Sequence, residues 1–436
     1  MRTGQPIEKH RRRQVNAAVL AVLMLLLLGT FSGAKQTSGQ AQRVFHFQSE
    51  GVVFRADFSA AAVADCSFLG ASEYRVVIRP ENEPINNSPW YAFQVTSEQP
   101  RAITVRLAYE GGTHRYRPKT STNGRDWTLL SEDACRVDRK GCEAVLRLQV
   151  GPQSLWVAAQ ELVAGETLAQ WMDSHTQLPS AVKREIGRSL QNRPIDLLEF
   201  GNRDSRRFVF ILGRQHPPEV TGSLGLMQFV DTLAGDSELA ARFQREFFVC
   251  VVPLANPDGV EAGHWRHNLG GVDLNRDWQG FRQPETKAIR DKILRLSQEQ
   301  GRLYLFLDFH STNQDIFYTQ PDDAVTFPRD FARNWLDAIQ ARFPDYRVRR
   351  EGTSHGGKPT SMRWVYRTFG VAAITYEWGD KTERDRIAKI ASGAAEEMMR
   401  LVLDEVALER VSATRNQSRL RPPIRYSSSV FYARAK

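Results

Sequence analysis

Cysteine is scarce in this sequence, and so are long apolar runs. The four cysteines show none of the paired short spacings of a zinc–thiolate site, so we do not expect one. With 41% hydrophobic and 25% charged residues, the composition excludes a multi-span membrane protein and a mostly disordered chain. A length of 436 residues is enough for two ordinary domains, each with its own core.

The positions of the cysteines leave their redox state open. Cys135 and Cys142 flank a hydrophilic turn that contains glycine, a spacing compatible with a small disulfide loop. Cys66 has no evident partner. Cys250 lies in an apolar run that predicts a buried strand, where a free thiol packs as a small hydrophobic group.

Positive charge is concentrated at the two ends of the chain. The formal net charge is +9, but residues 1–34 carry +4 and residues 410–436 carry +7, which leaves −2 for residues 35–409. A nearly neutral body without an interleaved basic and aromatic stripe argues against a nucleic-acid partner. We therefore expect no nucleic-acid binding, and we interpret residues 410–436 as a basic flexible tail.

The N-terminus has the order of parts found in an export signal. A basic segment ends at Arg13, an apolar run follows over residues 17–28, and small residues occupy 32–34, where a signal peptidase would cleave. The run is slightly short for a transmembrane helix of ~20 residues. We expect residues 1–34 to be a signal peptide, with an uncleaved anchor as the alternative. Membrane contact is then expected only through an uncleaved signal or the basic tail.

Residues 43–163 have the pattern of a β-rich domain. Short apolar or alternating segments are separated by clusters of glycine, proline, asparagine and aspartate, and no convincing helix lies among them. This pattern predicts an N-terminal β-sandwich domain. The expected strands include 74–78, 90–95, 102–109, 144–150 and 155–159.

Over residues 164–409, after a mixed connecting segment that reaches about residue 205, strands alternate with helices. Such alternation predicts an α/β domain with a largely parallel sheet, in which functional sites gather at the carboxyl ends of the strands. The expected strands are 208–212, 247–252, 303–309 and 371–376, and the expected helices lie near 222–235, 284–299, 327–342, 359–369 and 383–408.

Candidate metal ligands follow two of these strands directly. His216 and Glu219 come after the strand 208–212 and are separated by two prolines, which favour a stiff loop; His310 comes after the strand 303–309. Two imidazoles and one carboxylate are a common ligand set for catalytic zinc, which keeps a fourth position for water. A single His-x-x-Glu pair more often lies in a solvated loop, so the interpretation depends on further motifs.

Four further motifs occur between and after these residues. They are Asn-Pro-Asp-Gly at 256–259, His-Trp-Arg-His-Asn at 264–268, Val-Asp-Leu-Asn-Arg-Asp-Trp at 272–278 and Ile-Thr-Tyr-Glu-Trp-Gly at 374–379. Together with the candidate ligands they resemble the M14 family of zinc metallocarboxypeptidases, over roughly residues 185–400. The resemblance implies a zinc-carboxypeptidase-like catalytic domain, with a mixed, largely parallel sheet flanked by helices and one Zn²⁺ per chain.

The resemblance also implies which residues hold the metal. His216, Glu219 and His310 match the three zinc ligands of the family. Asp273 resembles the acidic residue that orients a ligand imidazole, here that of His216.

Four other residues match catalytic and substrate-binding positions of the family. Glu377 would be the general acid/base, which takes a proton from metal-activated water and passes it to the leaving amine. Arg266 would stabilise the developing oxyanion. Asn275 and Arg276 would bind the terminal carboxylate of a peptide or protein substrate. The implied activity is hydrolysis of the C-terminal peptide bond.

The β-rich region that precedes the catalytic domain contains Trp-Tyr-Ala-Phe at 90–93 and His-Arg-Tyr-Arg-Pro at 114–118. Within the family, this arrangement is similar to the cytosolic-carboxypeptidase (deglutamylase-type) branch, which pairs a β-sandwich with the zinc domain. That branch has an arginine in its specificity pocket, and Arg363 matches it, although its spacing from Glu377 departs slightly from the expected one. A match there implies a preference for acidic C-terminal residues. A tyrosine that the family often has in a mobile loop finds no counterpart in residues 354–359. With the export signal, the resemblance implies a bacterial protein of the periplasm or cell envelope.

Two other interpretations remain open. A zinc amidase or deacylase on the same fold, acting on acyl-amino acids or cell-wall peptides, also has substrates with a free carboxylate. A binding protein with a vestigial catalytic domain would use the β-sandwich for interaction, but the complete set of candidate ligands together with Arg266 and Glu377 argues against it.

Overall fold

We describe a computed structural model of the chain, which places residues 43–178, 180–352 and 357–419. These residues fall within one compact unit, Gln40–Lys436. The expected signal peptide at 1–34 and residues 420–436 of the expected tail lie outside the described residues. Within the described ranges, no helix combines the length and apolar character needed to cross a membrane.

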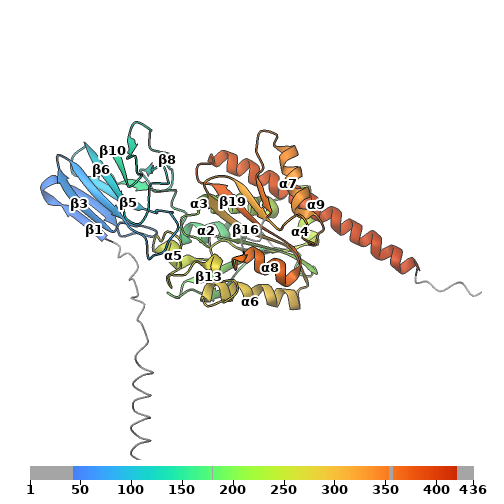
Figure 1. Cartoon of the computed structure of the whole chain (residues 1–436). Helices are drawn as coiled ribbons and strands as arrows, with labels where there is room; N and C mark the ends of the chain where they lie inside the picture. Colours follow the sequence, from blue (N-terminus) through green and yellow to red (C-terminus); the bar gives the residue numbers. More distant parts are fainter. Residues whose placement is uncertain (1–42, 179, 353–356, 420–436) are drawn as a thin grey trace, which may run out of the picture. The chain divides into compact units, whose positions relative to one another are not determined.

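Residues 43–163, which we call the β-sandwich region, contain two sheets (Figure 1). The strand order is β1-β2-β5-β11-β7-β8 in one sheet and β3-β4-β6-β10-β9 in the other. Buried side chains from both sheets form one hydrophobic cluster, which confirms the predicted sandwich. The strands are β1 (Arg43–Phe47), β2 (Val52–Ala56), β3 (Asp65–Gly70), β4 (Glu73–Ile78), β5 (Ala92–Ser97), β6 (Arg101–Tyr109), β7 (Lys119–Ser121), β8 (Thr128–Leu129), β9 (Cys135–Val137), β10 (Glu143–Val150) and β11 (Leu155–Ala158), with a 3₁₀ turn η1 (Gln48–Glu50) after β1.

Residues 164–419, which we call the α/β region, are built on one eight-stranded sheet of order β12-β13-β15-β14-β16-β19-β17-β18. Neighbours from β15 through β14 and β16 to β19 pair in parallel, as do β17 and β18, whereas the pairs β12–β13, β13–β15 and β17–β19 are antiparallel. The predicted mixed, largely parallel sheet is confirmed. The strands are β12 (Val182–Arg188), β13 (Pro194–Gly201), β14 (Arg207–Gly213), β15 (Phe248–Val252), β16 (Arg302–Thr312), β17 (Ile316–Thr319), β18 (Arg350–Gly352) and β19 (Ala372–Gly379).

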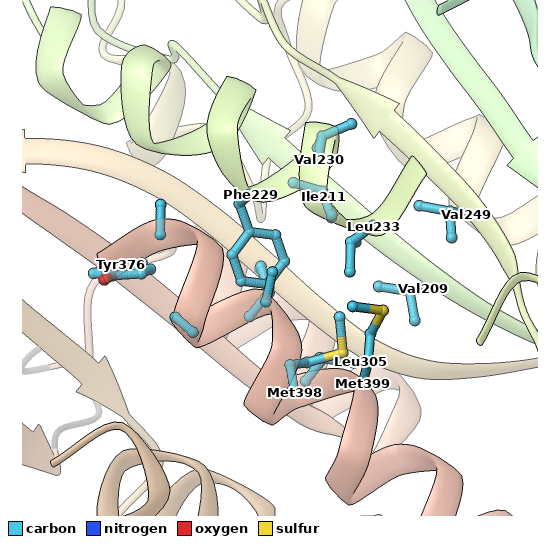
Figure 2. Packing of buried hydrophobic residues seen from close by; sticks show 14 of the residues in the cluster. Val209, Ile211, Phe229, Val230, Leu233, Val249, Leu305, Tyr376, Met398 and Met399 are labelled. Carbon is cyan, nitrogen blue, oxygen red and sulfur yellow. The ribbon is translucent and has the colours of Figure 1, made fainter. Parts of the chain in front are cut away.

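Helices cover both faces of this sheet, and alternate residues of its strands pack on opposite sides. Val209 and Ile211 of β14 join the cluster that includes α3 and α9, as Figure 2 shows. Phe208 and Phe210 join the cluster that includes α6 and α8. Burial on both faces explains why the strands are continuously apolar. The helices are α2 (Gly165–His175), α3 (Val220–Ala234), α4 (Glu238–Glu246), α5 (Pro257–Glu261), α6 (Pro284–Glu299), α7 (Phe331–Arg342), α8 (Ser361–Phe369) and α9 (Arg384–Arg419), with a 3₁₀ turn η2 (Leu274–Arg276).

The structure differs from the expected elements in a few places. The connecting segment 164–205 contains α2, β12 and β13. Helix α8 begins at Ser361 because the hydroxyl of Thr360 accepts the Arg363 N–H and caps the helix. Helix α9 continues to Arg419, so the first ten residues of the expected flexible tail are helical.

All four cysteines are free thiols in the structure. Cys135 and Cys142 do not form the disulfide loop that their spacing allowed. Cys250 is buried in β15 as expected, and burial raises the pKa of its thiol well above the usual range.

Candidate active site

Three neighbouring parallel strands, β14, β16 and β19, bring the candidate groups to one edge of the sheet. The loop after β14 carries His216 and Glu219, β16 carries His310, and β19 carries Glu377. His310 lies directly opposite Glu377 in the β16–β19 register. Because the carboxyl ends of parallel strands share an edge, residues far apart in the sequence become neighbours here.

A buried arginine fixes the loop after β14. Arg214, which is 1% exposed, donates from Nε to the carbonyl of Pro217 at 2.7 Å and from Nη1 to Ser223 Oγ at 2.9 Å. Burial lowers the pKa of Arg214 to about 10, and the carboxylate of Glu219 opposes this shift. The arginine thereby holds the Pro-Pro segment against the start of α3.

His216, Glu219 and His310 form one cluster, as the sequence predicted. Glu219 bridges the imidazoles: its Oε1 lies 2.8 Å from Nδ1 of His216 and its Oε2 lies 2.7 Å from Nδ1 of His310. Burial alone would raise the pKa of Glu219, but the adjacent imidazoles outweigh burial and hold this pKa below its usual range.

The Nε2 atom of each imidazole contacts a second carboxylate. Nε2 of His216 lies 2.9 Å from Asp273 Oδ1, which is the contact expected from the sequence. Nε2 of His310 lies 3.0 Å from Asp308 Oδ2, a partner that the sequence analysis did not name. Carboxylate–histidine pairs of this kind orient metal ligands and raise their basicity.

These residues fit a zinc ion. The nitrogen and oxygen atoms of the cluster lie within 4.8 Å of one another, and two imidazoles with one carboxylate form a donor set typical of catalytic zinc. Both imidazoles turn Nδ1 toward Glu219 and Nε2 toward a second carboxylate, that of Asp273 or Asp308, which fixes the nitrogen available to a metal.

A cavity of about 160 Å³ opens at the cluster. It brings together seven residues that the sequence predicted, namely His216, Glu219, Arg266, Asn275, Arg276, His310 and Glu377. Asp273 lies behind them, in contact with His216 and with Nε of Arg266 at 2.8 Å.

Glu377 has the electrostatics of a group that exchanges protons near neutral pH. Burial raises the pKa of its carboxyl to about 7, against the opposing charge of His310. Its Oε2 atom has no hydrogen-bond partner within the described part of the chain. The carboxyl therefore has an oxygen available to substrate.

Asn275 and Arg276 lie on η2, and Asn275 contacts Ser361, the first residue of α8. Asn275 Oδ1 accepts the backbone N–H of Ser361 at 3.0 Å, which fixes its amide group in the cavity wall. Arg276 donates from Nη1 to the carbonyl of Asn275 at 2.7 Å. Arg363, the candidate specificity residue, is partly buried on α8 and is not among the residues that line the cavity.

The β-sandwich region supplies part of the cavity wall, which the sequence analysis missed. Asn86, Ser88 and Arg115 line the cavity from loops between strands of the two sheets. Glu81, from the same loop as Asn86, accepts the backbone N–H groups of residues 265–267 at 2.7 to 3.0 Å. Arg115 lies in the segment 114–118 that the sequence likens to the cytosolic-carboxypeptidase branch, but that resemblance gave it no role in the site. The other three residues lie in no recognised motif, so only the folded structure brings all four to the site.

Residues 168–398 match the family of zinc carboxypeptidases known as peptidase M14. The chain belongs to this family. The six motifs and the predicted resemblance are thereby confirmed at the level of the family, and the protein is an enzyme of the zinc metallocarboxypeptidase class.

Relatives of the M14 chain include cytosolic carboxypeptidases, which agrees with the predicted branch. Cytosolic carboxypeptidase 6 of Caenorhabditis elegans is 22% identical over 335 residues, which cover 66% of this chain and 70% of that protein. The mouse protein of the same name is 27% identical over 139 residues, 30% of this chain and 26% of that protein. An uncharacterized protein of Zymomonas mobilis is 27% identical over 274 residues, 56% of this chain and 70% of that protein.

The fold is also that of solved metallocarboxypeptidases. The crystal structure of a metallo-carboxypeptidase from Burkholderia cenocepacia superposes with a TM-score of 0.67 over 81% of this chain and 99% of that chain, at 23% identity. The superposition spans more than the α/β region, so this fold includes strands of the β-sandwich region.

Proposed function

We propose that this protein is a carboxypeptidase that hydrolyses the C-terminal peptide bond of peptides or proteins, with zinc held by His216, Glu219 and His310. The observation that carries the proposal is the single cavity in which this cluster meets Glu377, Arg266, Asn275 and Arg276. Zinc bound there would polarise the scissile carbonyl and activate a water molecule.

Four residues of the cavity would have separate roles in the reaction. Glu377, whose pKa of about 7 suits both roles, takes a proton from the attacking water and passes it to the nitrogen of the leaving amine. Arg266, held through Nε by Asp273, faces the negative charge that develops on the carbonyl oxygen. Asn275 and Arg276 bind the terminal carboxylate, and this restricts cleavage to the last residue.

The test of the proposal is turnover of matched peptides. Peptides with a free C-terminal carboxylate should release their last amino acid, whereas the same peptides with a C-terminal amide should not be cleaved. Arg276→Met should raise KM for the free acids by about 10- to 100-fold, as expected for loss of a charge-assisted hydrogen bond. Cleavage of internal bonds would contradict the proposal, and cleavage of acyl-amino acids alone would favour an amidase.

We also propose a preference for acidic C-terminal residues, with Arg363 as the selecting group. Two contacts support it: Ser361 in the same helical turn binds Asn275, and Thr360, which caps that turn, lines the cavity. Arg363→Ala should abolish the preference, whereas Arg367→Ala, an exposed site on the same helix, should keep it. Equal turnover of peptides ending in Leu, Lys and Glu by the wild-type protein would contradict the preference.

We further propose that the protein is exported to the bacterial periplasm or cell envelope, because residues 1–34 have the order of a signal peptide. Cell fractionation and N-terminal sequencing of the mature protein test this. An intact N-terminus in the cytoplasmic fraction would contradict it.

A further inference from the structure

Arg115 is a wall residue of the catalytic cavity and of two other hollows. It lines the catalytic cavity of about 160 Å³, a hollow of about 650 Å³ and a hollow of about 410 Å³. Asp380 and Lys381 line the two larger hollows with it. This one side chain therefore forms part of the wall of all three hollows.

The guanidinium of Arg115 is fixed on two of its three nitrogens. Nε donates to Asp380 Oδ2 at 2.8 Å, and Nη1 donates to Ser88 Oγ at 2.7 Å and to the carbonyl of Asn87 at 3.2 Å. The Cζ atom of Arg115 lies 5.0 Å from the centroid of the Tyr116 ring, in a cation–π contact. Nη2 has no hydrogen-bond partner among the residues that the structure places, so its two donors remain for another molecule.

Asp380 ties this arginine to the catalytic strands. Asp380 directly follows β19, three residues after Glu377, and its N–H donates to the carbonyl of Thr312 at the end of β16. The side chain of Arg115 is only 16% exposed, and that of Asp380 only 6%. The position of the arginine is thus set by the same strand ends that carry His310 and Glu377.

A carboxypeptidase must hold more than the last residue of its substrate. If Asn275 and Arg276 bind the terminal carboxylate, the chain on the other side of the scissile bond has to leave the cavity, and its main-chain carbonyls need donors. We propose that this part of the substrate leaves past Arg115 and that Nη2 of Arg115 donates to one of its main-chain carbonyls. The inference rests on the proposed function, and it makes the β-sandwich region a part of the peptide-binding site.

This contact has a consequence for the class of substrate. An acyl-amino acid offers one carbonyl, the scissile one, and gains nothing from Arg115. An acetylated tripeptide or tetrapeptide offers further carbonyls upstream. The contact therefore favours peptides over acyl-amino acids, independently of the last side chain.

The experiment compares kcat/KM for acetyl-tetrapeptides and for the acetyl-amino acid with the same last residue, in the wild-type protein and in Arg115→Met. The variant should lose about 10- to 100-fold on the tetrapeptide and less than about threefold on the short substrate. The ratio within one preparation is insensitive to partial unfolding. Arg106→Met is the matched control, because Arg106 is likewise an arginine of the β-sandwich region held by ion pairs, with Glu73 and Glu143, but lines none of the three hollows.

A binding measurement separates this inference from the proposed function. In Glu377→Gln, calorimetry should show the tetrapeptide bound, and adding Arg115→Met should weaken that binding by the same factor. An equal loss on both substrates, or no change on either, would overturn the role of Arg115. If the wild-type protein binds tetrapeptides through Arg115 but hydrolyses none, the proposed function fails while this inference stands.

Discussion

The two regions of the molecule contribute to one cavity in different ways. In the α/β region the chemical groups follow strand ends, and their relative positions come from the register of β14, β16 and β19. In the β-sandwich region the groups lie in loops, and single side-chain contacts such as Arg115 to Asp380 set their positions. Sequence motifs therefore identify the candidate catalytic residues of the α/β region. The cavity wall that the β-sandwich region supplies is set by tertiary contacts.

The hydrophobic core of the β-sandwich region also includes residues of the α/β region. Its buried cluster includes Val220, Val260 and Trp265 from the α/β region. At Gly112 a Cβ atom would lie only 2.7 Å from the Trp265 ring, so the loop can approach this closely only as glycine. A region that shares its core with the catalytic one is expected to unfold together with it.

The largest effect is expected in the α/β region, from Glu377→Gln. The amide keeps the shape of the side chain but cannot accept a proton, so kcat should fall about 10²- to 10⁴-fold. Zinc content and melting temperature should stay near the wild-type values, since Glu377 is not one of the three clustered ligands. Unchanged hydrolysis would remove the catalytic role of Glu377.

Glu81 tests whether the β-sandwich region positions a catalytic group of the α/β region. Its carboxylate accepts three backbone N–H groups around Arg266, and its removal leaves these donors unpaired and the loop free to shift. Glu81→Ala should lower kcat about 10²-fold, the size expected for a small misplacement of a catalytic group, with little change in KM.

Glu81→Gln, which keeps one acceptor oxygen, should recover part of the loss. Glu83→Ala, at an exposed position in the same loop, is the control and should behave as wild type. If Glu81→Ala raised KM and lowered kcat no more than Glu83→Ala does, the β-sandwich region would have no part in positioning Arg266.

A smaller effect is expected from Asp308→Asn, which tests the partner of His310 that the sequence analysis did not name. Asp308 Oδ2 also accepts from Gln215 Nε2 at 2.7 Å and from the Ser361 hydroxyl. Loss of its charge should weaken zinc binding about 10- to 100-fold in competition with a chelator. Asp273→Asn should do the same and also lower kcat, because Asp273 holds Arg266. Identical effects of the two variants on kcat would contradict this division.

The sequence predicted the fold well where one physical rule dominates. Apolar runs bounded by turn residues located β14, β16 and β19, and helical periodicity located α6 to the residue. It failed over 164–205, where α2 and β12 are largely exposed or half-buried and so have weak patterns, and it did not separate the mostly buried β13 from this segment.

The residues of the candidate site were likewise predicted only where a sequence motif contains them. The residues in motifs, from His216 to Glu377, converge in one cavity because each follows a strand end or a turn with a recognisable composition. Glu81 could not be predicted, because a lone charged residue in a loop has the same local sequence whether it is solvated or buried. Arg115 lies in the segment 114–118 that resembles the branch, but the sequence alone does not show that its side chain reaches the cavity. Arg363 stays a prediction: Thr360, which caps the same helix, lines the cavity, whereas Arg363 is not among the lining residues.

The prediction with the smallest expected effect on activity concerns stability, at the buried carboxyl of Glu285 in the α/β region. Glu285 at the start of α6 is 0% exposed and accepts from Asn268 Nδ2 at 3.1 Å; Asn268 in turn holds the turn that leads to Asp273. Burial raises the pKa of Glu285 to about 7 from an ordinary value of 4.5.

Because the folded chain binds this proton more tightly than the unfolded chain does, the contribution of Glu285 to the free energy of unfolding is highest below about pH 4.5 and declines as the pH rises to about 7. Glu285→Gln removes this dependence. In urea titrations, the variant should gain up to about 3 kcal/mol on the wild type between about pH 5 and pH 8. Glu299→Gln, at an exposed position on the same helix, should show no such trend. A difference between Glu285→Gln and wild type that stays constant with pH would mean that the carboxyl is already ionised in the folded protein, and that Asn268 holds the turn against a buried charge.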